Sequence, residues 1–163
     1  MSHGECHIGA RLVPRISVLG LVAALTLILA ACGGSGSAGA PSSTPPAASS
    51  AGTQTSEGGN VTVKVTWQGT AAGPVFTVSM DTHSVDLDRY DLCQLAVLRT
   101  DQGQEIQPTG WDAPKGGHHR EGTLTFPATT ADGQPVVGPN TRNVELVIRN
   151  VAGVPERILR WTV

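Results

Sequence analysis

The sequence predicts an all-β domain over residues 60–163, built as an immunoglobulin-like β-sandwich. Short segments that alternate apolar and polar residues recur there at intervals of about 10 to 15 residues, a pattern typical of half-buried strands. Turn signals rich in Gly, Pro, Asn and Asp separate these segments. No segment of this region has a convincing helical period. A small closed β-barrel is the alternative architecture.

The expected strands follow one another along the chain, and two pairs of them form hairpins. The turn signal T-D-Q-G-Q at 100–104 joins the first pair, and N-V-A-G-V-P-E at 150–156 joins the second. A Pro- and Gly-rich loop separates the first hairpin from the strand T-L-T-F, which ends at Phe126. The expected strands cover residues 61–67, 76–80, 95–99, 105–107, 123–126, 144–148 and 158–163.

The first 31 residues have the order of parts found in a secretory signal peptide. Two arginines precede an apolar stretch at 16–31, which is shorter than the roughly 20 residues that span a bilayer. The stretch ends in L-A-A-C, which resembles the bacterial lipobox, with Leu29, Ala30, Ala31 and the acceptor thiol of Cys32. This resemblance implies removal of the leader and an N-terminal lipid anchor on the extracytoplasmic side of the cell membrane. An ordinary signal peptide with an incidental cysteine is the alternative.

A linker is expected between the lipidated cysteine and the domain. Residues 33–59 are rich in Gly, Ser, Pro and Thr and have no apolar side chain larger than Ala. Such a segment is predicted to be disordered, because nothing that it buries offsets the entropy of ordering it. The expected organisation is a signal peptide at 1–31, the lipidated Cys32 with its linker at 32–59, and the β-sandwich at 60–163.

Cysteine usage predicts a domain without an internal disulfide. Cys6 belongs to the expected leader and Cys32 would carry lipid, which leaves Cys93 as the one unmodified thiol. Cys93 lies in the apolar run L-C-Q-L-A-V-L, where we interpret it as a small buried hydrophobic residue. A reactive or metal-binding thiol is the alternative.

Charge argues against one class of partner. The chain has a net charge of −2 and no cluster of Lys and Arg residues. Proteins that collect phosphate backbones need such a basic patch, so we expect no nucleic-acid partner.

Three histidines remain after removal of the leader, and they indicate a metal site. His83, His118 and His119 all fall in expected loops, and imidazole is the commonest protein ligand for zinc and copper. Neighbouring side chains on an extended backbone face apart, so only one of His118 and His119 should join His83. The remaining ligands could come from Asp81, Asp112 or Met80. The alternative is that these histidines only order their loops.

Two other kinds of site are poorly supported. Asp86 and Asp88 match the start of a calcium-binding loop, but the sixth position holds Asp91 instead of Gly, and the twelfth holds Val97 instead of Glu. Ser84 lies beside a histidine, but adjacency in sequence does not make a nucleophile and its base. We therefore expect no enzymatic activity.

Three segments of the domain resemble a group of exported β-rich bacterial proteins. They are D-T-H-S-V-D-L at 81–87, G-W-D-A-P-K-G-G-H-H-R-E-G-T-L-T-F at 110–126, and V-E-L-V-I-R-N-V-A-G-V-P-E-R at 144–157. The likeness covers most of residues 60–163 and implies an exported domain without assigning a role to any residue. A looser similarity is to exported copper-binding β-sandwiches of the CopC type. Those usually carry a histidine at the mature N-terminus, where this chain would have a lipidated cysteine.

The sequence thus predicts a lipid-anchored, extracytoplasmic binding or accessory module. Its candidate ligand is copper or zinc, held by His83 and one of His118 and His119. The alternative function is a purely structural or protein-interaction domain of the cell envelope, without metal. The expected partners are the membrane, through the lipid anchor, and a protein or metal that the sequence does not identify.

Overall fold

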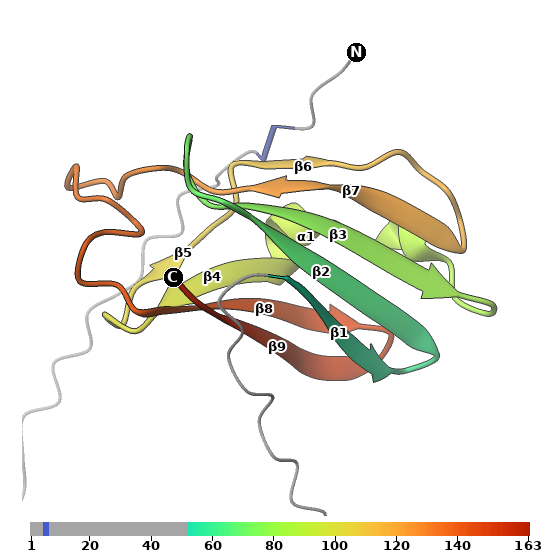
Figure 1. Cartoon of the computed structure of the whole chain (residues 1–163). Coiled ribbons are helices and arrows are strands. Elements are labelled where there is room, and N and C mark those ends of the chain that lie inside the picture. The colour runs from blue at the N-terminus through green and yellow to red at the C-terminus, as the bar shows by residue number, and fades with distance from the viewer. Residues whose placement is uncertain (1–4, 7–51) are drawn as a thin grey trace, which may run out of the picture. The chain divides into compact units, whose positions relative to one another are not determined.

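The computed structural model describes residues 5–6 and 52–163 and confirms the mostly-β prediction (Figure 1). Two antiparallel sheets, one of five strands and one of four, pack together in a manner consistent with a β-sandwich. The expected leader, the lipobox positions Leu29, Ala30, Ala31 and Cys32, and the first part of the expected linker lie outside the described residues. Within the described ranges, no helix has the length and apolar character needed to cross a membrane.

The five-stranded sheet has the order β1-β2-β3-β7-β6, and the four-stranded sheet has the order β5-β4-β8-β9. A short 3-10 helix and a one-turn α-helix lie between β3 and β4. The strands of the first sheet are β1 (Thr53–Gly58), β2 (Val61–Gly69), β3 (Val75–Thr82), β6 (Gly110–Asp112) and β7 (His119–Thr125). Those of the second are β4 (Ala96–Thr100), β5 (Glu105–Ile106), β8 (Asn143–Val151) and β9 (Val154–Thr162). The helices are η1 (Leu87–Arg89) and α1 (Leu92–Leu95).

The predicted alternation places the core between the two sheets. Val61, Val63 and Val65 of β2 are at most 2% exposed, while the residues between them face outward. The other sheet contributes apolar residues from β4, β8 and β9. Burial of such side chains, at about 25 cal/mol per Å² of apolar surface, is the main force that holds the sheets together. Aromatic rings gather at one place in this core, where Trp67, Phe76, Phe126 and Trp161 contact one another.

Strand β1 lies inside the segment predicted to be linker, so that prediction is wrong for residues 53–59. β1 pairs with β2 in continuous register from Thr53 opposite Thr66 to Gly58 opposite Val61. The two-residue turn between the strands is Gly59-Asn60, with φ values of 57° and 60°. Both residues are left-handed, as a type I′ hairpin requires. A side chain at Gly59 would also collide with the carbonyl of Ala152. The folded domain therefore begins at least seven residues earlier than expected.

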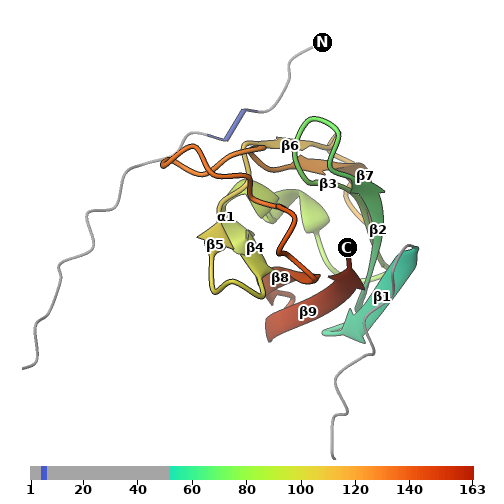
Figure 2. The ribbon, with the colours of Figure 1, turned by 60° about the vertical axis from the view of Figure 1, so that its left-hand side comes forward.

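β1 has no apolar side chain. The edge that does not pair with β2 faces β9, whose side chains donate hydrogen bonds to the backbone at and next to β1 (Figures 1 and 2). The guanidinium of Arg157, which is only 2% exposed, donates to the Ser56 carbonyl at 3.1 Å and to the Gly58 carbonyl at 2.6 Å. Trp161 Nε1 donates to the Gly52 carbonyl at 3.1 Å. Burial lowers the pKa of Arg157 from its ordinary value, and the backbone carbonyls of β1 accept hydrogen bonds from its two terminal nitrogens.

The acidic residues before β4 act as helix caps. Asp86 accepts a hydrogen bond from the Asp88 N–H at the start of η1, and Asp91 accepts one from the Cys93 N–H at the start of α1. Capping by a carboxylate satisfies N–H groups that a helix leaves without partners. This spacing of aspartates therefore organises two short helical turns.

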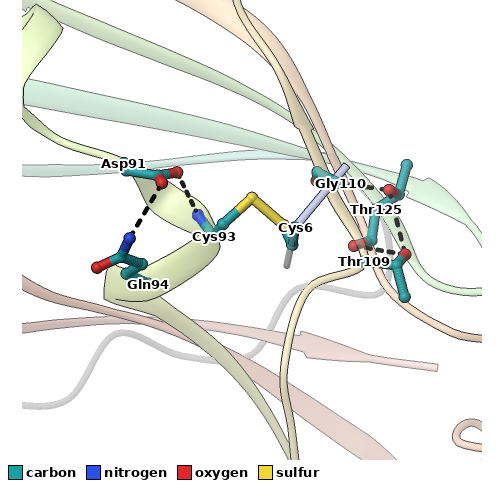
Figure 3. Close-up of a disulfide and its surroundings, with 7 residues drawn as sticks. All are labelled: Cys6, Asp91, Cys93, Gln94, Thr109, Gly110 and Thr125. Carbon is teal, nitrogen blue, oxygen red and sulfur yellow. Dashed lines mark hydrogen bonds between the residues drawn. A yellow bond between two sulfur atoms is a disulfide. The ribbon is translucent and has the colours of Figure 1, made fainter. Parts of the chain in front are cut away.

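Cys93 forms a disulfide with Cys6 in the full-length chain (Figure 3). The Cys6 N–H donates to the Thr109 carbonyl at 3.0 Å, and Glu5 pairs with Gly110 as an antiparallel bridge. The prediction of a domain without an internal disulfide is wrong for this form, and Cys93 is half-buried rather than a core residue. Cleavage before Cys32 would separate Cys6 from the polypeptide that contains Cys93, so the mature chain by itself would not contain this disulfide.

Candidate functional site

The candidate histidine site lies on the outer face of the five-stranded sheet, at the end where β3 stops and β7 begins. Strand register aligns Glu57, Thr62, Asp81 and His119 across β1, β2, β3 and β7. Asp81 was expected in a loop but belongs to β3, and His119 is the first residue of β7. The Asp81 and His119 side chains are 42% and 68% exposed. Alternation along both strands directs them to solvent, because their neighbours Met80 and Arg120 are buried.

Asp81 and His119 are joined by a hydrogen bond. The distance between His119 Nδ1 and Asp81 Oδ1 is 2.8 Å, and Ser79 Oγ donates to Asp81 Oδ2 at 3.0 Å. The hydrogen bond from His119 is the main reason that the pKa of Asp81 lies below its ordinary value. A carboxylate at Nδ1 favours the tautomer in which Nδ1 carries the proton and Nε2 has a free lone pair. In this tautomer Nε2 is available to a metal or to a hydrogen-bond donor.

His83 is the second imidazole of the site. It follows β3 immediately, is exposed, and has its ring centroid 6.5 Å from that of His119, with the planes at 83°. Two imidazoles on one tetrahedral zinc have centroids about 5 Å apart, given Zn–N bonds of about 2.0–2.1 Å. The two rings therefore lie about 1.5 Å farther apart than a shared zinc ion requires. An open pocket of about 550 Å³ lies beside this ring, lined by Glu57, Gly58, Asn60, Val61, Thr62, His83 and Ser84.

The structure brings two of the three histidine side chains together, those of His83 and His119. His118 contributes its backbone, because its carbonyl accepts the Thr82 N–H at 3.0 Å. Of the neighbouring pair it is His119 whose side chain lies next to His83 and Asp81. Within the described ranges, no group of three or more His, Cys, Asp or Glu side chains could hold a metal ion. Water or another molecule would have to complete the coordination.

The other expected ligands do not join this cluster. Met80 is a fully buried core residue, so the suggestion that it completes the shell is wrong. Asp81 hydrogen-bonds to His119 through Oδ1 and accepts from Ser79 through Oδ2. Asp112 pairs with Thr123, four residues along β7 from His119 and thus about 13 Å away along the strand.

The loop before His119 is positioned by two residues, Asp88 and Arg120, whose roles the sequence analysis did not predict. Asp88 accepts the N–H groups of Gly116 at 2.9 Å and Gly117 at 3.3 Å. Arg120 is 9% exposed and donates to the carbonyl of Ala113, in that loop, at 3.4 Å and to the carbonyl of Tyr90 at 2.7 Å. Its guanidinium lies 5.6 Å from the Trp111 ring. A charged residue at an inward position of the β7 alternation was the available signal for Arg120. The Gly-Gly pair was the signal for a loop held by its backbone amides.

The Asp88 anchor predicts a specific titration. The hydrogen bond from the Gly116 N–H is the largest cause that lowers the pKa of Asp88. A lowered carboxyl pKa stabilises the folded loop above the unfolded value of about 3.9, and the effect is lost as pH falls through the folded pKa. NMR titration of the Gly116 and Gly117 amides should therefore show a midpoint below pH 3.9, which Asp88→Asn should abolish. A midpoint at or above pH 4 in the unmodified chain would contradict this anchor.

Comparison with known protein families, with curated proteins and with solved structures gave no match for this chain. The similarities to exported β-rich proteins and to CopC-type copper proteins therefore remain expectations.

Proposed function

We propose that the chain is a lipid-anchored, extracytoplasmic binding or accessory module of the immunoglobulin-like sandwich type. Its ligand is copper or zinc, held by His83 and His119. The observation that carries this proposal is the 2.8 Å contact between Asp81 and His119, next to a second exposed imidazole. A histidine that binds metal through one ring nitrogen commonly donates from the other to a carboxylate, which orients the ring and raises its basicity.

The donor set favours divalent copper over zinc. Nitrogen ligands bind Cu²⁺ more tightly than Zn²⁺ in the Irving–Williams order, and Cu²⁺ accepts a tetragonal arrangement completed by water. Two protein imidazoles and an open pocket on one side suit such a site better than a closed structural zinc site, which needs four protein ligands. The metal would be exchangeable, as expected of a module that passes or senses an ion.

The proposal is tested by titrating copper and zinc into the chain that begins at Gly52. For copper we expect a dissociation constant of about 10 μM or tighter at pH 7.5 and a melting temperature that rises with metal concentration. The affinity should fall in acid, because a histidine must lose its proton to coordinate a metal. His83→Ala and His119→Ala should each weaken binding at least about tenfold. Asp81→Asn should have an intermediate effect.

His118→Ala is the matched control, because its side chain faces away from that of His119 on the extended backbone. This variant should bind copper as the unmodified chain does. Equal losses in the His118 and His119 variants would indicate nonspecific binding, and no binding tighter than about 10 μM would remove the metal proposal.

The same experiment tests the second candidate function, a structural or protein-interaction domain of the cell envelope. The contact between Asp81 on β3 and His119 on β7 favours it, because this hydrogen bond also ties two strands together. In that case metal would leave the melting temperature unchanged. His119→Ala would lower stability by about 0.5–1.5 kcal/mol, the range for a lost hydrogen bond.

The proposed lipid anchor is tested by substitution of Cys32. Lipid modification requires this thiol, so Cys32→Ser should prevent acylation and leave a precursor of full length. Mass spectrometry of the membrane fraction and partitioning into detergent would measure both effects. Ala31→Ser, which keeps a small residue before the cut, is the control. Normal cleavage and membrane retention of the Cys32 variant would contradict the lipobox assignment.

A further inference from the structure

We propose that the free edge of β6, together with Cys93, is a docking site for an extended, cysteine-bearing segment of another exported protein, to which Cys93 becomes linked by a disulfide. The proposal rests on the leader removal included in the proposed function, because that cleavage takes Cys6 away. It is independent of the metal site.

The first observation is the edge itself. β6 is the outer strand of the five-stranded sheet, and residues 5–6 pair with its free side. The Cys6 N–H donates to the Thr109 carbonyl at 3.0 Å, and Glu5 bridges Gly110 in antiparallel register. These contacts use backbone groups, so they select an extended conformation and not a particular side chain. Addition of a strand to an exposed sheet edge is a common mode of peptide recognition.

The second observation is the position of Cys93. Its Cα lies 5.4 Å from that of Cys6, and its N–H is held by Asp91 Oδ1 at 3.0 Å at the start of α1 (Figure 3). One segment therefore meets two requirements at once, because its backbone pairs with the edge while its sulfur reaches Cys93. Cys93 is half-buried with this segment in place, so departure of the segment exposes the thiol further.

Removal of the leader leaves the β6 edge without a paired segment and Cys93 without a disulfide partner. The cytoplasm keeps thiols reduced, so a precursor awaiting export would not form the Cys6–Cys93 bond there. After cleavage, the sulfur of Cys32 is a thioether and cannot form a disulfide. Cys93 is then the single thiol of the mature chain, and an odd thiol in an oxidising compartment indicates pairing between molecules.

A cysteine on an extended segment fits this position better than Cys93 of a second copy. Cys93 of another molecule would arrive on α1, whose helical backbone cannot add to the β6 edge. Only an extended partner satisfies the Thr109 carbonyl and reaches the sulfur together.

The reaction is thiol–disulfide exchange, for which the partner's own disulfide is the oxidant. The Cys93 thiolate attacks one sulfur of that disulfide and forms the new sulfur–sulfur bond, while the other sulfur leaves as a thiolate and takes a proton. One disulfide is broken and one is formed, so no further electron acceptor is required.

The test uses the mature chain from residue 32 onward with Cys32→Ser, so that Cys93 is its only thiol. The probe is a ten-residue peptide with the sequence of residues 1–10, whose cysteine is activated as a mixed disulfide with 2-thiopyridine. Release of 2-thiopyridone is followed by absorbance. The controls are the same peptide N-methylated at its cysteine amide, and cysteamine activated in the same way. Cys93→Ser gives the background rate.

We expect the peptide to react about tenfold faster than activated cysteamine, because backbone pairing worth one to two hydrogen bonds concentrates it at the thiol. N-methylation should return the rate to that of cysteamine, because it removes the hydrogen bond to the Thr109 carbonyl. Equal rates for the three probes, a fast reaction that N-methylation does not slow, no reaction above background, or preferential formation of a Cys93–Cys93 dimer would each overturn the proposal. None of these results bears on lipidation or metal binding, which are measured separately.

Discussion

A chain that begins at Gly59 instead of Gly52 should lose about 3–5 kcal/mol of unfolding free energy. The shorter chain lacks β1. It therefore lacks the Ser56 and Gly58 carbonyls, which accept hydrogen bonds from the buried guanidinium of Arg157. It also leaves the edge of β2 unpaired. Urea denaturation of the two chains, at equal protein concentration, measures the difference.

A matched substitution separates the two causes of this loss. In the chain without β1, Arg157→Met should recover part of the lost stability, because an apolar side chain of similar length needs no hydrogen-bond acceptors. In the chain with β1, the same substitution should be destabilising, because the β1 carbonyls lose their donors. If the two chains have equal stability, β1 contributes nothing and residues 53–58 behave as the linker first expected.

Trp161→Ala should lower the unfolding free energy by about 3–5 kcal/mol, the cost of removing a large aromatic side chain from a core. Trp161 is 0% exposed and lies with its ring centroid 5.2 Å from Phe76 and 6.4 Å from Trp67. Thermal unfolding and urea denaturation measure the effect.

Trp161→Phe is the control for this prediction. It keeps an aromatic ring but removes the Nε1 donor to the Gly52 carbonyl, so it should cost less than the alanine variant. An alanine variant within about 1 kcal/mol of the unmodified chain would show that the aromatic cluster repacks and does not hold the sheets together.

The strands with strong alternation were predictable from sequence, and their positions agree with the structure. β2, β3 and β8 each have three or more inward apolar residues, which is the pattern that burial of one sheet face imposes. Both expected hairpins, β4 with β5 and β8 with β9, are also present. These strands are stabilised by burial of their own apolar side chains, so the alternating pattern is visible in their sequences.

β1 and β6 could not be found in the same way. β1 is polar throughout and is held by pairing with β2 and by Arg157, which lies about a hundred residues away in sequence. β6 has only Trp111 as a buried residue. The Gly59-Asn60 pair was a usable sequence signal for the β1–β2 hairpin. Both residue types readily adopt the left-handed backbone conformation that a type I′ turn requires, and both have it in the structure.

The candidate site was partly predictable. Residue type pointed to His83, Asp81 and the pair His118 and His119 without choosing between the two neighbours. The structure brings the side chains of His83, Asp81 and His119 to one end of β3 and β7. The role of Asp81 was not predictable, because whether a carboxylate contacts a metal or a histidine ring depends on strand register. The loop anchor at Asp88 depends on a pairing between segments 28 residues apart, which composition does not reveal.

The position of β1 at the N-terminal side of the domain has a mechanical consequence. A pulling force applied through the preceding residues, as in a chain held at Cys32, reaches β1 before any other strand. The first contacts under load are those of Gly52 with Trp161 and of Thr53 with Thr66. Peeling β1 from that end would lengthen the chain by about 20 Å, at about 3.3 Å per residue, while the apolar core between the sheets stays closed. β1 would thus extend under tension and re-form when the tension is released.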